Sequence, residues 1–79
     1  MKHSTLNRLT KGSTFFDSES FKYIVSKVYG NNNNVTGVRA DCVWKNDYGG
    51  FSERKYLSRD ELLTEEYDNE FVEIKDREL

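Results

Sequence analysis

The chain is short, close to neutral and poor in reactive side chains. It has 79 residues with a formal net charge of −2, one Cys, one His and no Pro. A domain of this size buries only about 60% of the surface of its unfolded chain, which leaves little room for a deep active-site cleft. A lone cysteine excludes an intramolecular disulfide, and no apolar stretch approaches the roughly 20 residues that cross a bilayer. The start of the chain also lacks the apolar segment of a signal peptide, so we expect a cytoplasmic protein.

The N-terminal part predicts one short strand followed by a turn. We expect residues 1–5 to be frayed. Residues 14–16 are Thr-Phe-Phe, which suits a short strand. The next four residues, 17–20, are Asp-Ser-Glu-Ser, all common in turns.

Three apolar-patterned runs follow and predict a β-meander. They cover residues 21–29, 35–45 and 51–57, and two loops rich in Asn and Gly, 30–34 and 46–50, separate them. Gly-containing connections of this length are common in β-hairpins. The local pattern and the loop composition therefore agree on three antiparallel strands.

Alternation along the middle run predicts the core. Val38, Ala40, Cys42 and Trp44 share one face, and the polar side chains lie mostly on the other. We expect this set to point inward. The flanking strands add Tyr23, Val25, Ile24, Val28, Tyr56 and Leu57. Both faces of the first run are apolar, which leaves its buried face open and suits a strand that bends over the core.

The segment after the meander predicts a short helix and a last strand. Ser58 and Glu61 have the spacing of a capping box, so a helix is expected to begin at Arg59 within residues 59–67. Leu62 and Leu63 would close one end of the core. Residues 71–74 suit a last strand, and residues 75–79 are expected to be frayed.

This order of elements resembles an SH3-like small β-barrel. The resemblance is carried by residues 9–15 leading to 21–25, the two hairpins, residues 56–58 with 61–63, and residues 71–74. It implies a mostly β protein with a single domain over residues 1–79, about five strands and one short helix. Barrels of this kind bind proteins, RNA or methylated peptides. The Asn run and the absence of Pro also resemble small accessory proteins of phages with A/T-rich genomes.

Charge divides the chain into two parts. Residues 1–59 carry ten Lys and Arg against five Asp and Glu, whereas residues 60–79 carry two against nine. The acidic segment is expected either to lie on the basic part or to form a surface of its own.

The residue types present argue against catalysis. The sole histidine, His3, lies in the terminus that we expect to be frayed, and Cys42 belongs to the apolar face of the middle run. A cysteine nucleophile needs a base within hydrogen-bond reach. Zinc needs clustered Cys and His, and the acidic residues lack the spacing of a calcium loop. We therefore expect no enzyme activity, no metal and no cofactor.

The leading hypothesis is a phage-type accessory protein that binds, and can inhibit, a host protein or a protein–nucleic acid complex. Eleven aromatic residues exceed what so small a core can hide, so we expect Phe15, Phe16, Tyr48, Phe51 and Tyr67 to be partly exposed. Exposed aromatics with Arg at their margins are typical of protein interfaces. The residues predicted to bind a partner are Tyr48, Phe51, Arg39, Lys45, Arg54 and Tyr67.

The alternative is RNA or single-stranded DNA bound by the outside of the meander. Basic side chains on a sheet with interleaved aromatics are expected at such a site. Asp41 and Glu53 on the same strands argue against it. The residues predicted for this role are Lys22, Lys27, Arg39, Lys45, Arg54, Lys55 and Tyr29. The sequence identifies neither the partner nor the oligomeric state.

Overall fold

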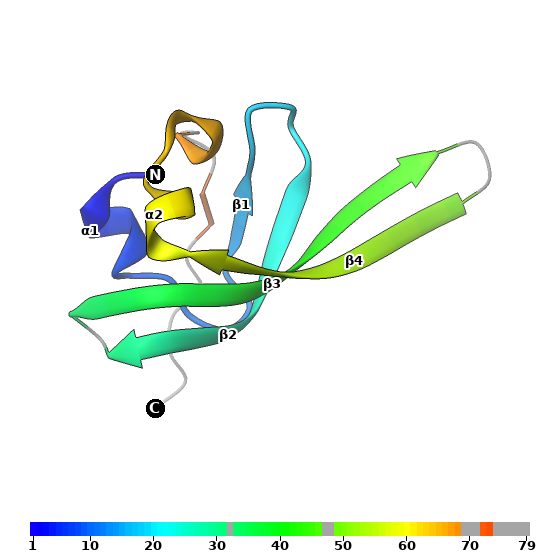
Figure 1. Ribbon diagram of the computed structural model, residues 1–79. Helices are drawn as coiled ribbons and strands as arrows, with labels where there is room; N and C mark the ends of the chain where they lie inside the picture. The colour runs from blue at the N-terminus through cyan, green and yellow to red at the C-terminus, as the bar shows by residue number, and fades with distance from the viewer. Residues whose placement is uncertain (32, 47–48, 69–71, 74–79) are drawn as a thin grey trace.

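The protein is mostly β, with four antiparallel strands in one sheet. The computed structural model describes residues 1–31, 33–46, 49–68, 72 and 73, and the side chains of all of these except 45 and 46. The strands are β1 (Thr14–Phe16), β2 (Lys22–Asn31), β3 (Asn34–Asn46) and β4 (Gly49–Ser58), in the order β1-β2-β3-β4 (Figure 1). The predicted meander and the predicted short first strand are therefore confirmed.

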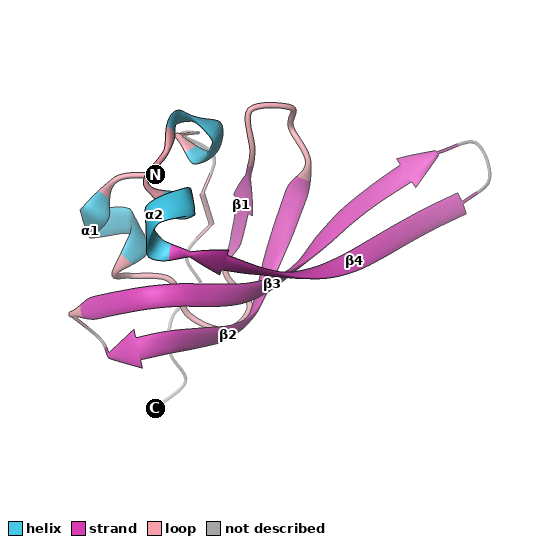
Figure 2. Cartoon of the chain, in the orientation of Figure 1, coloured by secondary structure: helices cyan, strands magenta, loops and turns pink. Residues whose placement is uncertain are grey.

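Three short helical segments accompany the sheet. They are α1 (His3–Leu6), α2 (Arg59–Leu62) and the 3-10 helix η1 (Glu65–Tyr67), and they gather at one end of the sheet (Figure 2). The Ser58 hydroxyl accepts a hydrogen bond from the Glu61 amide at 3.3 Å, which confirms the predicted cap at the start of α2. None of the helices that the structure describes has the length and apolar character to span a membrane.

Asp17 holds the turn between β1 and β2. One oxygen of its buried carboxylate accepts hydrogen bonds from the amides of Glu19 and Phe21 at 2.9 and 3.0 Å. The other accepts one from the Tyr23 hydroxyl at 2.9 Å. A side chain that bonds the backbone just after it fixes a tight turn, so the predicted turn at residues 17–20 is confirmed.

A β-bulge decides which face of β2 is buried. Val25 pairs with Ala40 and Lys27 with Arg39, so Ser26 is an extra residue in β2. The bulge shifts the alternation by one residue, and both Val25 and Val28 therefore point to the core side. Ile24, opposite Asp41, lies on the other face, so the two faces of β2 that the sequence suggests are divided at the bulge.

The helical segments cover one face of the sheet, which we call the inner face. Leu6 from α1 and Leu62 from α2 are completely buried there against the strands. Met1 is also buried, and its amino group donates a hydrogen bond to the Thr64 carbonyl at 3.3 Å. The start of the chain, predicted to be frayed over residues 1–5, is instead anchored by buried Met1 and by helix α1, although Lys2, His3 and Ser4 stay exposed.

The two edges of the sheet differ. Beyond β1, Thr14 and Glu73 exchange two backbone hydrogen bonds of 2.9 Å. The other members of the predicted last strand, apart from Val72, lie outside the described residues. Beyond β4, no residue that the structure describes pairs with the strand. The described strands thus form an open sheet and not the closed barrel that the resemblance implies.

Three aromatic side chains lie where the sequence did not predict them. Phe15 and Tyr67, predicted to be partly exposed, are 0% and 6% exposed. Tyr56, predicted to join the core, is 58% exposed. Phe15 and Tyr67 pack with Tyr23 in one cluster, and this contact between distant parts of the chain is not encoded in any local pattern.

Candidate functional site

The strand register collects basic side chains on the face opposite the helical segments, which we call the outer face. Residues directly opposite each other in an antiparallel pair share a face. Lys27 is opposite Arg39, and Arg39 is opposite Tyr56. Two residues away, Arg54 is opposite Asp41. The exposed cations of this face are Lys22, Lys27, Arg39 and Arg54.

Two tyrosines lie among these cations. The rings of Tyr29 and Tyr56 meet edge to face with their centroids 5.5 Å apart, and the Lys27 ammonium lies 5.1 Å from the centroid of the Tyr29 ring. Tyr56 covers Gly37, where a methyl group would overlap its ring. A glycine beneath an exposed ring lets the ring lie flat along the strands, so Gly37 sets the position of Tyr56.

The outer face keeps a positive charge of its own. Within the described part of the chain, the only ion pair joins Arg54 Nε to Asp41 Oδ1 at 3.1 Å, so Asp41 offsets one of the four cations. The exposed acids of α2, η1 and the residue after them do not pair with the other three. These acids are Asp60, Glu61, Glu65, Glu66 and Asp68. Glu70, Asp76 and Glu78 of the acidic segment lie outside the described residues, so the two expectations from the charge pattern stay predictions.

Several predicted site residues do not join the outer face. Lys55 and Phe51 occupy positions of β4 that alternate with Arg54, so they belong to the inner face. Tyr67 is buried in the core. Lys45 pairs with Gly50 through its backbone, but its side chain lies outside the described residues, as does all of Tyr48.

Phe51 forms a second exposed aromatic feature, on the β3–β4 hairpin. Its ring stacks on Trp44 with a centroid distance of 6.0 Å and an interplanar angle of 21°. Phe51 is 45% exposed, and Figure 1 shows the hairpin running beyond the other strands. The stacked rings of Phe51 and Trp44 therefore leave part of the Phe51 ring open to solvent.

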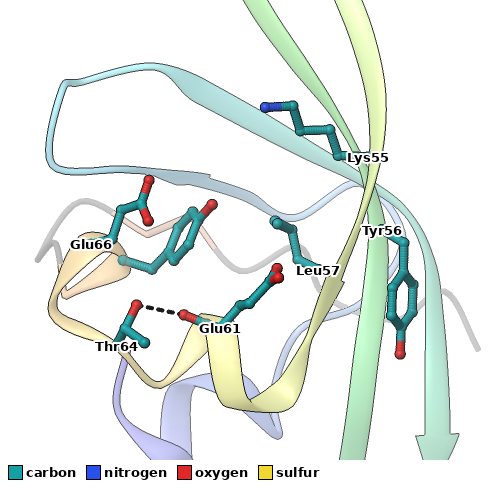
Figure 3. A pocket seen from close by; sticks show the side chains of 7 residues that line it. Lys55, Tyr56, Leu57, Glu61, Thr64 and Glu66 are labelled. Carbon is teal, nitrogen blue, oxygen red and sulfur yellow. Dashed lines mark hydrogen bonds between the residues drawn. The ribbon is translucent and has the colours of Figure 1, made fainter.

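A pocket of about 480 Å³ opens on the inner side of β4, between this strand and the helical segments (Figure 3). Lys55 brings one cation to it, whereas Glu61 and Glu66 bring two carboxylates. The ring of Tyr56 points away from the pocket, on the other side of β4, which agrees with its place on the outer face (Figure 3). The full lining is Lys55, Tyr56, Leu57, Glu61, Thr64, Glu66 and Tyr67.

Tyr67, which lines this pocket, and Tyr23, whose ring packs against it, are buried and have altered acidity. Burial, followed by hydrogen bonds with Tyr67 and Asp17, raises the pKa of Tyr23 well above its ordinary value. Burial is also the main reason why the pKa of Tyr67 is raised, with a further contribution from the negative charge of Glu66. Both hydroxyl groups are therefore neutral near pH 7, and neither is suited to act as a general base.

The described residues offer little for metal or covalent chemistry. They contain no group of three or more His, Cys, Asp or Glu side chains placed to hold a metal ion. Cys42 is buried on the inner face. The Arg59 guanidinium donates a hydrogen bond to His3 Nδ1 at 2.9 Å. Its contact is thus a structural one between α1 and the start of α2.

The residue that sequence analysis missed is Tyr56. Its neighbour Leu57 was correctly expected to face the core, and strict alternation along β4 then places Tyr56 outside, next to Arg39. The same rule separates Lys55 from Arg54. The alternation of side chains along β4 is the sequence signal that could have placed Tyr56 on the outer face.

We compared the chain with known protein families, curated proteins and solved structures. No protein-family model, no curated protein and no solved structure matches the chain. The function therefore has to be argued from the outer face itself.

Proposed function

We propose that the protein is a non-enzymatic binding module whose outer face binds single-stranded RNA or DNA. The observation that carries this proposal is that Lys27, Arg39 and Arg54 lie near the exposed ring of Tyr56, with Lys22 farther along the same face. Cations along a sheet attract the phosphate backbone, and an exposed aromatic ring stacks on a base whatever its identity.

The shape and charge of the face favour a single strand over a duplex. Tyr56 is 58% exposed and presents its ring beside Arg39 on a sheet surface that carries no described helix. No helix within the described residues exceeds four residues, so none of these is suited to the major groove. Glu61 and Glu66 line the pocket on the inner side of β4, and among the described residues Asp41 is the acid that pairs with a cation of the outer face.

The test is the affinity for a short fluorescent oligonucleotide, measured by anisotropy at several salt concentrations. We expect binding that weakens as salt rises, with a slope of about −0.7 for each phosphate neutralised. Tyr56→Ala is expected to weaken binding by about 1–3 kcal/mol through the lost stacking. Arg39→Gln is expected to reduce the salt slope by about one phosphate contact.

The matched control for a charge reversal is Lys2→Glu, which changes the net charge as much as Lys27→Glu does. Lys2 is exposed and precedes α1, on the side of the molecule away from the outer face. Lys27→Glu is expected to weaken binding much more than Lys2→Glu. Absence of binding at low salt, or equal effects of the two reversals, would contradict the proposal.

A second candidate is the protein-binding role, and Phe51 supports it. A ring that is 45% exposed and stacked on Trp44 at a projecting hairpin has the character of an interface residue. Such a role fits a phage-type accessory protein with an SH3-like arrangement, and the pairing of Glu73 with Thr14 supports that arrangement because it returns the chain to β1.

The protein-binding role predicts capture of a stoichiometric bacterial protein from a nuclease-treated lysate. Phe51→Ala is expected to abolish the capture, whereas Phe21→Ala, which changes another exposed ring, is expected to leave it intact. Capture that needs nucleic acid would instead assign the contact to the outer face.

A further inference from the structure

We propose that the free edge of β4 pairs with β4 of a second copy of the chain, antiparallel and about a twofold axis at Arg54. The two open sheets would become one sheet of eight strands. The proposal does not depend on nucleic-acid binding, and its test contains no oligonucleotide, so either proposal can fail without the other.

The first support is the difference between the two edges. At the β1 edge, Thr14 already bonds Glu73 through the backbone. The β4 edge is open along ten residues as far as the structure describes the chain. A long open edge presents unpaired amide and carbonyl groups and is a template for another strand. Residues Gly49 to Tyr56 are all exposed, so side chains do not bury it.

The second support is a self-complementary charge pattern. With the axis at Arg54, Glu53 lies opposite Lys55 of the second copy, and its Glu53 lies opposite Lys55 of the first. Opposite charges directly across an antiparallel pair are favourable. Moving the axis to residue 53 would place two glutamates face to face, and moving it to residue 55 would place two lysines face to face. Each of these three registers places one like-charge pair on the axis, but only the register centred on Arg54 adds two opposite-charge pairs beside it, so the charges favour this register.

The apolar residues agree with this register. Phe51 falls opposite Leu57 of the second copy, and Leu57 lines the inner pocket of about 480 Å³. The exposed Phe51 ring of each copy would thus lie at the pocket of the other, as a twofold interface requires. The two Arg54 side chains meet at the axis, where each already has a partner in Asp41 of its own chain at 3.1 Å.

The test is the molar mass in solution across a dilution series, by sedimentation velocity. We expect a reversible dimer of twice the 9.3 kDa chain. Glu53→Lys and Lys55→Glu are each expected to weaken it by about ten- to a hundredfold, since each creates two like-charge pairs by symmetry. The controls Glu65→Lys and Lys11→Glu make the same changes of net charge at exposed positions outside β4 and are expected to leave the dimer intact.

Two restorations make the register itself testable. The double variant E53K/K55E rebuilds both opposite-charge pairs and is expected to dimerise like the unaltered chain. A mixture of the two single variants is expected to form a one-to-one heterodimer, because one chain then carries two lysines and the other two glutamates. A monomer at every concentration would overturn the proposal. So would single variants that dimerise normally, or a double variant and a mixture that stay monomeric.

Discussion

Phe15→Ala is expected to lower the free energy of unfolding by about 3–5 kcal/mol. The Phe15 side chain is completely buried, with its ring stacked on Tyr23 at 5.1 Å and edge-on to Tyr67 at 5.9 Å. Removing it leaves a cavity between β1, β2 and η1 that backbone pairing prevents from collapsing. A small domain has only about 5–15 kcal/mol in total, so the variant loses a large part of its stability.

Urea unfolding followed by circular dichroism measures this loss. Phe21→Ala is the matched control, because it removes the same side chain from a position that is 38% exposed. We expect the control to change the free energy of unfolding by about 1 kcal/mol or less. Equal effects of the two substitutions would show that Phe15 is not part of the core described above.

The elements that the sequence predicts well are those with local causes. The meander follows from alternation and from Asn- and Gly-rich loops, and the start of α2 follows from Ser58 three residues before Glu61. Helix α1 has no such signal. It depends on distant contacts instead, such as the Asn7 side chain accepting a hydrogen bond from the Val35 amide at 3.1 Å.

The errors in the predicted site also arise where the structure depends on distant contacts and not on a local pattern. Arg39 and Arg54 were correctly assigned to one surface, because β3 and β4 pair without irregularity from Gly37 to Asn46. The face of Lys27 depends on the bulge at Ser26, which no residue pattern announces. Burial of Tyr67 depends on η1 folding back over β1 and β2, where the Ser18 amide donates to the Glu66 carbonyl at 2.7 Å.

Alkaline pH is expected to destabilise the fold through Tyr23 and Tyr67. Both have a pKa raised above the ordinary value of 10.0, mainly by burial. Below pH about 10 both are neutral in the folded and the unfolded chain, so their contribution to stability is fully present. Above pH about 10, the tyrosine hydroxyls lose their protons in the unfolded chain but keep them in the folded chain. Each tyrosine then lowers the free energy of unfolding by about 1.4 kcal/mol per pH unit until its folded pKa is reached.

Urea unfolding at a series of pH values above 10 measures this slope, and Tyr67→Phe isolates one tyrosine. All other groups are common to the unaltered chain and to Tyr67→Phe, so their contributions cancel in the comparison. Tyr67→Phe keeps the ring that packs on Phe15 and removes the titrating hydroxyl. We expect its stability to fall less steeply with pH, by about 1.4 kcal/mol per unit. Tyrosinate absorbance from the buried pair is expected to appear only as the circular dichroism is lost. If the free energy of unfolding fell equally steeply with pH in both chains, Tyr67 would ionise within the folded state. Burial by η1 would then not raise its pKa.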